Sequence, residues 1–217
     1  MCALDQFASL HLVLASAKAV KRAAFISFGV ACVAGLALAA TSSWWILIVG
    51  VISVLAAWGY TGGHTPYGYL GFGELSVFTF FGVVATVGTY YVQTLEFSAA
   101  AFAASVSMGS LSCALLAINN IRDRAQDAQV GKKTLAVRLG DENARRFFIA
   151  LLALPYIFAP LTGNPLAFLT LASAPHALAI AREVRAGATG ESLIPLLGRT
   201  GQLQLHFSLT FAIALSF

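Results

Sequence analysis

The chain has 217 residues, of which 59% are hydrophobic and 10% charged, and its formal net charge is +4. Soluble domains carry about 25% charged residues, and a soluble bundle needs a wet exterior that this composition does not supply. The composition therefore excludes an ordinary soluble domain and predicts a membrane-embedded protein. Apolar segments long enough to cross a bilayer as helices predict an all-α membrane helix bundle.

Seven apolar segments follow a mildly apolar start, residues 1–18, that lacks the layout of a signal peptide. Several of them are near the short limit of about 17 residues for crossing a bilayer. Glycine-rich, serine-containing or charged stretches separate them. Gly140 is expected to end one helix and Asp141 to cap the next. In chain order, the predicted spans are 19–40, 44–58, 74–93, 97–118, 146–161, 165–181 and 203–217. The fourth span contains small residues that allow close helix packing: Ser105, Ser107, Gly109, Ser110 and Ser112.

The placement of the charges predicts an orientation. If the first span starts on the inner side, the inner face carries residues 1–18 and the loops 60–73, 119–145 and 182–202. All thirteen Lys and Arg residues then fall on the inner side or at inner helix ends, as the positive-inside rule requires. We therefore expect a multi-pass protein of the cell (plasma) membrane whose functional loops face the cytoplasm.

The longest polar run, residues 119–140, carries a spacing typical of a metal site. Asn119, Asp123 and Asp127 are four residues apart, so a helix places them within an arc of about 80°. Their oxygens suit Mg²⁺, which usually shares its ligands with a substrate phosphate. A solvated loop whose acids balance its bases is the alternative, and spacing alone does not decide between them. Cations that suit phosphate oxygens lie nearby: Arg122, Lys132, Lys133 and Arg138.

A second inner loop, 60–73, interleaves tyrosines with glycines. Glycines allow the backbone to approach a ligand closely, and aromatic rings stabilise a cation. An interfacial loop with anchoring tyrosines is the alternative. His64 lies in this loop, and Glu74 follows it at a helix start, where a carboxylate suits the helix dipole.

These two loops carry a resemblance to a known family. The stretches NNIRDRAQDAQVGKKTLAVRLGD, YTGGHTPYGYLGFGE and VFTFFGVVATVGTYYVQ resemble the 1,4-dihydroxy-2-naphthoate polyprenyltransferases of menaquinone synthesis, within the UbiA superfamily of intramembrane prenyltransferases. The similarity runs from about Leu10 to the end of the chain, so residues 1–217 are expected to form a single membrane-embedded prenyltransferase domain.

The resemblance implies a function and a site. The family fold has nine transmembrane helices around a cavity that opens to the cytoplasm, and two Asp-rich motifs hold Mg²⁺ and the diphosphate of a polyprenyl donor. Asn119, Asp123 and Asp127 match the second motif, and Tyr60 matches a superfamily tyrosine. The implied reaction transfers the polyprenyl group to 1,4-dihydroxy-2-naphthoate with loss of CO₂, giving demethylmenaquinone. Its partners are the two substrates and the lipid bilayer, with no nucleic acid.

The chain departs from the family pattern in two places, and these departures bear on its function. The first Asp-rich motif, N-D-x-x-D-G, is absent, so the chain is expected to be N-terminally incomplete, with seven spans against nine. A truncated, inactive remnant or a non-catalytic membrane subunit is therefore the alternative to the enzyme. Relatives carry a basic residue near positions 64–65, where His64 would contribute to diphosphate binding. A transporter ranks last, because charges in mid-span are nearly absent.

Overall fold

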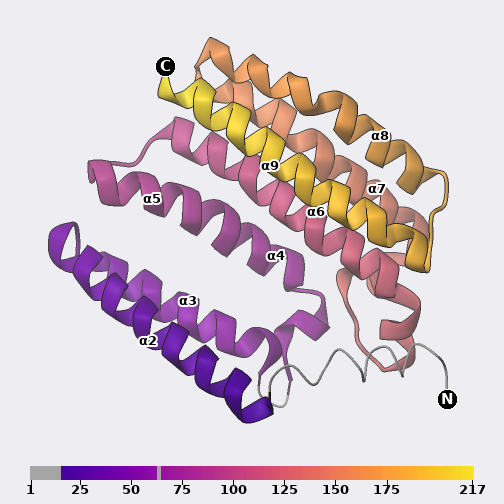
Figure 1. Ribbon diagram of the computed structural model, residues 1–217, viewed down its shortest axis with the longest axis horizontal. Coiled ribbons are helices and arrows are strands. Elements are labelled where there is room, and N and C mark those ends of the chain that lie inside the picture. Colours follow the sequence, from indigo (N-terminus) through magenta and orange to yellow (C-terminus); the bar gives the residue numbers. More distant parts are fainter. Residues whose placement is uncertain (1–15, 63–64) are drawn as a thin grey trace. The chain divides into compact units, whose positions relative to one another are not determined.

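The computed structural model describes residues 16–62 and 65–217, and these residues are almost entirely helical (Figure 1). The all-α prediction is confirmed. His64 and residues 1–15 of the predicted inner segment 1–18 lie outside the described residues. The chain divides into two compact units, Met1–Val54 and Leu55–Phe217, each described here by itself.

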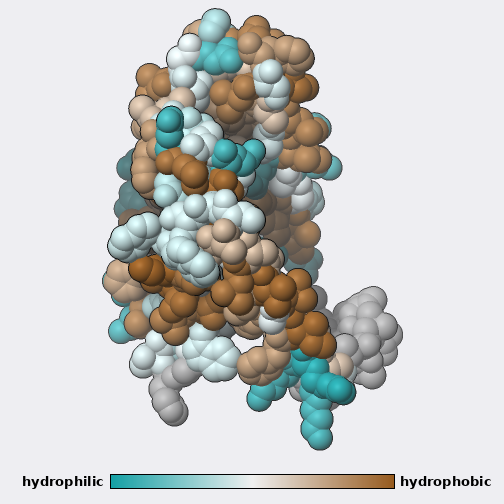
Figure 2. All heavy atoms as spheres, turned by 90° about the vertical axis from the view of Figure 1, so that its left-hand side faces the viewer, coloured by the Kyte–Doolittle hydropathy of each residue, from teal (hydrophilic) through white to brown (hydrophobic). Residues whose placement is uncertain are grey.

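The first unit contains helix α2 (Ala17–Thr41) and the beginning of α3 (Trp45–Thr61). The Ser16 side chain caps α2 by accepting a hydrogen bond of 3.2 Å from the backbone N–H of Ala19. Large apolar side chains are exposed along both helices; Val33, for example, is 69% exposed. Figure 2 shows one face of the molecule, on which brown apolar side chains spread widely over the surface. Such exposure is expected of helices that contact lipid.

The second unit is built around α6, which packs against α7, α9 and the third predicted span. That span is a continuous helix with a central π-helical stretch, Phe78–Val84. Gly82 in this stretch lies directly against Gly109 of α6. The close helix packing predicted from the small residues of the fourth span is therefore observed at Gly109. The elements of this unit are η1 (Tyr67–Leu70), α4 (Gly73–Val77), η2 (Phe78–Val84), α5 (Ala85–Thr94), α6 (Ala99–Gln129), α7 (Leu135–Phe158), η3 (Ala159–Thr162), η4 (Pro165–Ser173), α8 (Ala174–Arg185), η5 (Gly190–Leu193) and α9 (Ile194–Ser216).

Each predicted span corresponds to helical structure in the described residues, although several bounds differ. Within residues 16–62 and 65–217, four stretches are long and apolar enough to cross a membrane, and Trp45–Thr61 is a shorter apolar helix. The sixth span is wrong as one regular helix, because it begins as a 3₁₀ helix before α8. The four long stretches are Lys18–Thr41, Gly73–Thr94, Ala99–Gln129 and Leu135–Thr162.

The polar run 119–145 is wrong as a loop. Helix α6 continues through it to Gln129, α7 begins at Leu135, and only residues 130–134 between them are not helical. Hydropathy ends a predicted span where charges begin, but these charges are paired on the helices themselves and do not end them. Gly140 does interrupt α7, with φ 75° and ψ 173°, a backbone conformation that favours glycine.

Candidate functional site

The two loops that the sequence singles out are in contact. The backbone N–H of Lys133 donates a hydrogen bond of 2.8 Å to the carbonyl oxygen of Tyr69. The Lys132 ammonium lies 4.8 Å from the centre of the Tyr69 ring, within the range of a cation–π interaction. Arg138 donates a hydrogen bond of 3.1 Å to the carbonyl oxygen of Lys133. The second loop, 60–73, therefore lies against the connection between α6 and α7. This contact agrees with the prediction that both loops lie on the inner side of the membrane.

The three predicted metal ligands all lie on α6, which confirms that their spacing is helical. Asp123 receives two hydrogen bonds from the Arg122 guanidinium, each 2.7 Å long. Asp127 is only 6% exposed, and one of its oxygens is 3.0 Å from the Lys132 ammonium. Its hydrogen bond is the main cause that raises the pKa of Lys132 above its ordinary value. Each acid of the pair is thus neutralised by a neighbouring cation.

The donor set at the end of α6 fits one side of a divalent cation. Among the residues that the structure describes, no group of three or more His, Cys, Asp and Glu side chains is placed to hold a metal ion. Two carboxylates and the Asn119 carboxamide are hard oxygen donors, and Mg²⁺ needs few protein ligands when a phosphate and waters supply the others. These residues therefore suit a metal shared with a ligand rather than one enclosed by protein.

Tyr60 lies at the end of α3 beside the second loop. Its ring meets that of Tyr67 edge to face, with 5.6 Å between the ring centroids. The Tyr67 hydroxyl donates to the carbonyl oxygen of Ala56 at 2.8 Å and lies 2.9 Å from the hydroxyl of Ser76. Tyr67 therefore ties the loop to α3 and α4 and fixes the position of the Tyr60 ring.

The structure adds Glu74 and Asn120 to this region. Glu74 is 5% exposed, and one of its carboxylate oxygens accepts a hydrogen bond of 2.9 Å from the side-chain amide of Asn120. The other oxygen is buried and has no hydrogen-bond partner among the residues that the structure describes. The sequence placed Glu74 at a helix start but did not identify its partner, because the contact links α4 to α6, one residue away from Asn119. The Asn pair at 119–120 was the only available signal.

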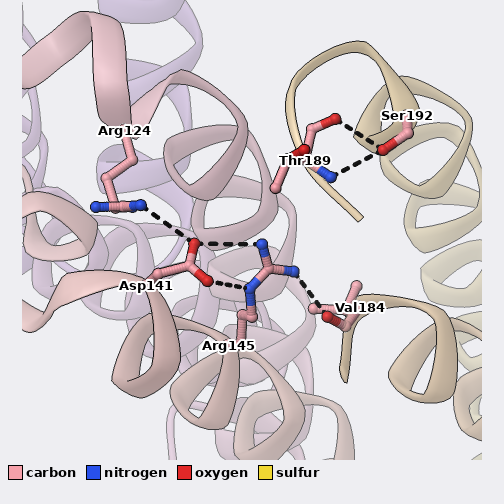
Figure 3. A network of polar contacts seen from close by, with 6 residues as sticks. All are labelled: Arg124, Asp141, Arg145, Val184, Thr189 and Ser192. Carbon is pink, nitrogen blue, oxygen red and sulfur yellow. Dashed lines mark hydrogen bonds and ion pairs between the residues drawn. The ribbon is translucent and has the colours of Figure 1, made fainter. Parts of the chain in front are cut away.

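An ion network around the buried Arg145 side chain joins the polar ends of three helices (Figure 3). Arg145 of α7 donates to both oxygens of Asp141, at 2.7 and 3.2 Å, and to the carbonyl oxygen of Val184 in α8, at 2.7 Å. Arg124 of α6 reaches the same carboxylate at 3.3 Å. Arg124 lies between Asp123 and Asp127 in the sequence, so the network holds the acid-bearing end of α6 against α7.

We expect Asp141→Asn to lower the free energy of unfolding by about 3 kcal/mol, because it leaves the buried Arg145 guanidinium without its counter-charge. Thermal denaturation in detergent measures the change. The matched control is Glu142→Gln in the adjacent ion pair to Arg146, whose side chains are 78% and 70% exposed. It should change stability by less than about 0.5 kcal/mol. Equal effects of the two variants would contradict the structural role of the network.

Comparison with known proteins identifies the family. Residues 9–192 match the UbiA prenyltransferase family. This chain belongs to the UbiA prenyltransferase family. The resemblance carried by its polar loops is confirmed, and its membrane helices and all-α fold agree with that family.

Three relatives of this UbiA prenyltransferase carry the name 1,4-dihydroxy-2-naphthoate octaprenyltransferase. The protein from Mycobacterium tuberculosis (strain ATCC 25618 / H37Rv) is 45% identical over 98% of this chain and 75% of its own length. The Mycobacterium leprae (strain TN) protein is 41% identical over 94% of this chain and 70% of its own length. The Escherichia coli (strain K12) protein is 35% identical over 90% of this chain and 67% of its own length.

Proposed function

We propose that this chain transfers a polyprenyl group from a polyprenyl diphosphate to 1,4-dihydroxy-2-naphthoate. The observation that carries the proposal is the contact between Asp127, Lys132 and Tyr69, which brings a carboxylate, a cation and an aromatic ring together at the end of α6. Membership of the prenyltransferase family and the names of the three relatives support the same reaction.

Different residues around the acid-bearing end of α6 would bind the metal ion and the phosphate oxygens of the donor. Asn119, Asp123 and Asp127 would hold Mg²⁺. When bound, Mg²⁺ neutralises the diphosphate and makes it a better leaving group. Donors to its phosphate oxygens would be Arg122, Lys132 and Lys133, with His64 in a weaker role.

The chemistry then requires protection of an allylic cation. The bond between the allylic carbon and the diphosphate oxygen breaks, and the ring carbon that bears the carboxylate bonds to the allylic carbon. The diphosphate leaves with the electron pair of the broken bond, and loss of CO₂ returns an electron pair to the ring, giving demethylmenaquinol. Two-electron oxidation of this quinol by dioxygen would then give demethylmenaquinone. Tyr60, held by Tyr67, would present its ring to the developing positive charge.

The proposed setting is the plasma membrane, with the site open to the cytoplasm. The helices long enough to cross a bilayer support a multi-pass arrangement. The basic residues at one end of α6 and α7, in contact with the second loop, support an inner location by the positive-inside rule.

A direct assay tests this function. Membranes that contain the full chain, given radiolabelled polyprenyl diphosphate, 1,4-dihydroxy-2-naphthoate and Mg²⁺, are expected to form a labelled lipid-soluble naphthoquinone. Chelation of divalent cations should abolish the product, and added Mg²⁺ should restore it. 4-Hydroxybenzoate is the control acceptor and should give no product. Absence of the naphthoquinone with Mg²⁺ present would contradict the proposal, and product formation that survives chelation would contradict the metal role.

A further inference from the structure

Both acids proposed to hold Mg²⁺ are already paired with cations proposed to bind the diphosphate. Arg122 covers both oxygens of Asp123, and Lys132 pairs with Asp127. The same four side chains therefore form two internal ion pairs in the ligand-free protein. Each ligand must therefore compete with these pairs for the same charged groups.

We propose that Arg122 and Lys132 exchange partners when the ligands enter, so that a divalent cation and a diphosphate bind together far more tightly than either binds alone. The proposal rests on the function proposed above. In the free protein the two cations neutralise the acids; in the loaded protein the metal neutralises the acids and the two cations neutralise the phosphates.

Each ligand alone meets an opposing cost. A divalent cation alone must displace Lys132 and Arg122 from the carboxylates, and it leaves these cations without an anion. A diphosphate alone draws the cations away and leaves Asp123 and Asp127 unpaired. Asp127 is only 6% exposed, and a buried charge that loses its partner is strongly destabilising. When both ligands enter, every charge finds an opposite charge.

The exposure and geometry of the Lys132 and Arg122 side chains allow this exchange. The Lys132 side chain is 35% exposed, and its long flexible stem lets the ammonium turn while the adjacent backbone stays bonded to Tyr69. The Arg122 guanidinium makes two parallel hydrogen bonds to Asp123, and the same geometry suits two phosphate oxygens. Both cations lie within the reach of water, since the Arg122 side chain is 28% exposed.

The proposed exchange predicts that one substitution strengthens metal binding and weakens diphosphate binding. Lys132→Gln releases Asp127 from its ion pair, so binding of Mn²⁺ alone should become about tenfold tighter. The electron paramagnetic resonance of free Mn²⁺ measures this binding to the detergent-solubilised full chain. Retention of ³²P-labelled inorganic diphosphate at saturating Mg²⁺ should become about tenfold weaker. Arg122→Gln should show the same two changes through Asp123, which gives a second test if one variant does not fold.

For binding of Mn²⁺ alone, the control is Lys133→Gln, which removes the same charge one residue further on from a side chain proposed to contact the diphosphate but not an acid. The side chain of Lys133 is exposed, and no ion pair to it occurs among residues 16–62 and 65–217. Its effect on Mn²⁺ binding should stay within about twofold. If Lys132→Gln and Arg122→Gln bind Mn²⁺ no more tightly than this control, the exchange is wrong while the proposed function stands. If the wild-type chain retains no diphosphate at any Mg²⁺ concentration, the proposed function itself fails.

Discussion

Asp127→Asn is expected to lower kcat/KM for prenyl transfer by about a hundredfold to a thousandfold, the loss typical when a group that stabilises transition-state charge is removed. The amide keeps the shape of the side chain but removes the negative charge that would hold Mg²⁺. It also leaves Lys132 without the acid that lies 3.0 Å away. Asp123→Asn should cause a loss of the same order. Initial rates with radiolabelled polyprenyl diphosphate at saturating acceptor measure both.

Glu142→Gln provides the control for this prediction, because it makes the same carboxylate-to-amide change in an exposed side chain of α7. Its rate should equal that of the wild type, and thermal denaturation should show that the Asp127 variant remains folded. A folded Asp127→Asn protein with wild-type kcat/KM would exclude the metal-binding role.

The sequence predicted the helical spacing of the three candidate ligands correctly but placed the end of their helix too early. The four-residue spacing of Asn119, Asp123 and Asp127 is a local property, and the structure places all three on α6. The end of that helix was predicted too early, because hydropathy treats every charge as a break. Here the charges at the helix end find partners such as Arg122 with Asp123, so the helix continues.

Contacts between distant parts of the chain could not be predicted. Asn120 and Glu74 are 46 positions apart, and Arg145 and Val184 are 39 apart. Each residue alone has an ordinary local explanation, as a helix start or part of a basic run. Only the packing of α4 against α6, and of α7 against α8, brings the Asn120 amide to the Glu74 carboxylate and the Arg145 guanidinium to the backbone carbonyl of Val184.

The packing of α6 against the third span is another contact whose partner could not be predicted from the sequence. Small residues in the fourth predicted span indicated a close helix contact, and Gly109 is one of them. Their periodicity did not identify the partner, since the third span contains both Gly82 and Gly88. In the structure only Gly82 lies against α6; at Gly88 an added Cβ would meet no atom within 4 Å.

Gly82→Ala is therefore expected to destabilise the protein by about 3 kcal/mol, at the upper end of the usual cost of overpacking. A Cβ at position 82 would lie 2.6 Å from the Cα of Gly109 and 3.0 Å from the carbonyl oxygen of Ser105. Both are backbone atoms of α6, so no side-chain rotation relieves the overlap and the two helices must separate. Thermal denaturation in detergent measures the loss.

Two matched glycine variants make this prediction specific. Gly88→Ala, in the same continuous helix, should leave the midpoint unchanged or raise it slightly, because alanine favours helix. Gly109→Ala should be intermediate: its Cβ would lie 2.9 Å from the Phe78 ring, which can turn, and 3.1 Å from the Cα of Gly82, which cannot. Equal losses at positions 82 and 88 would mean that helix propensity, not the contact with α6, determines the effect. The order 82, 109, 88 follows only if backbone contact sets the distance between the third span and α6.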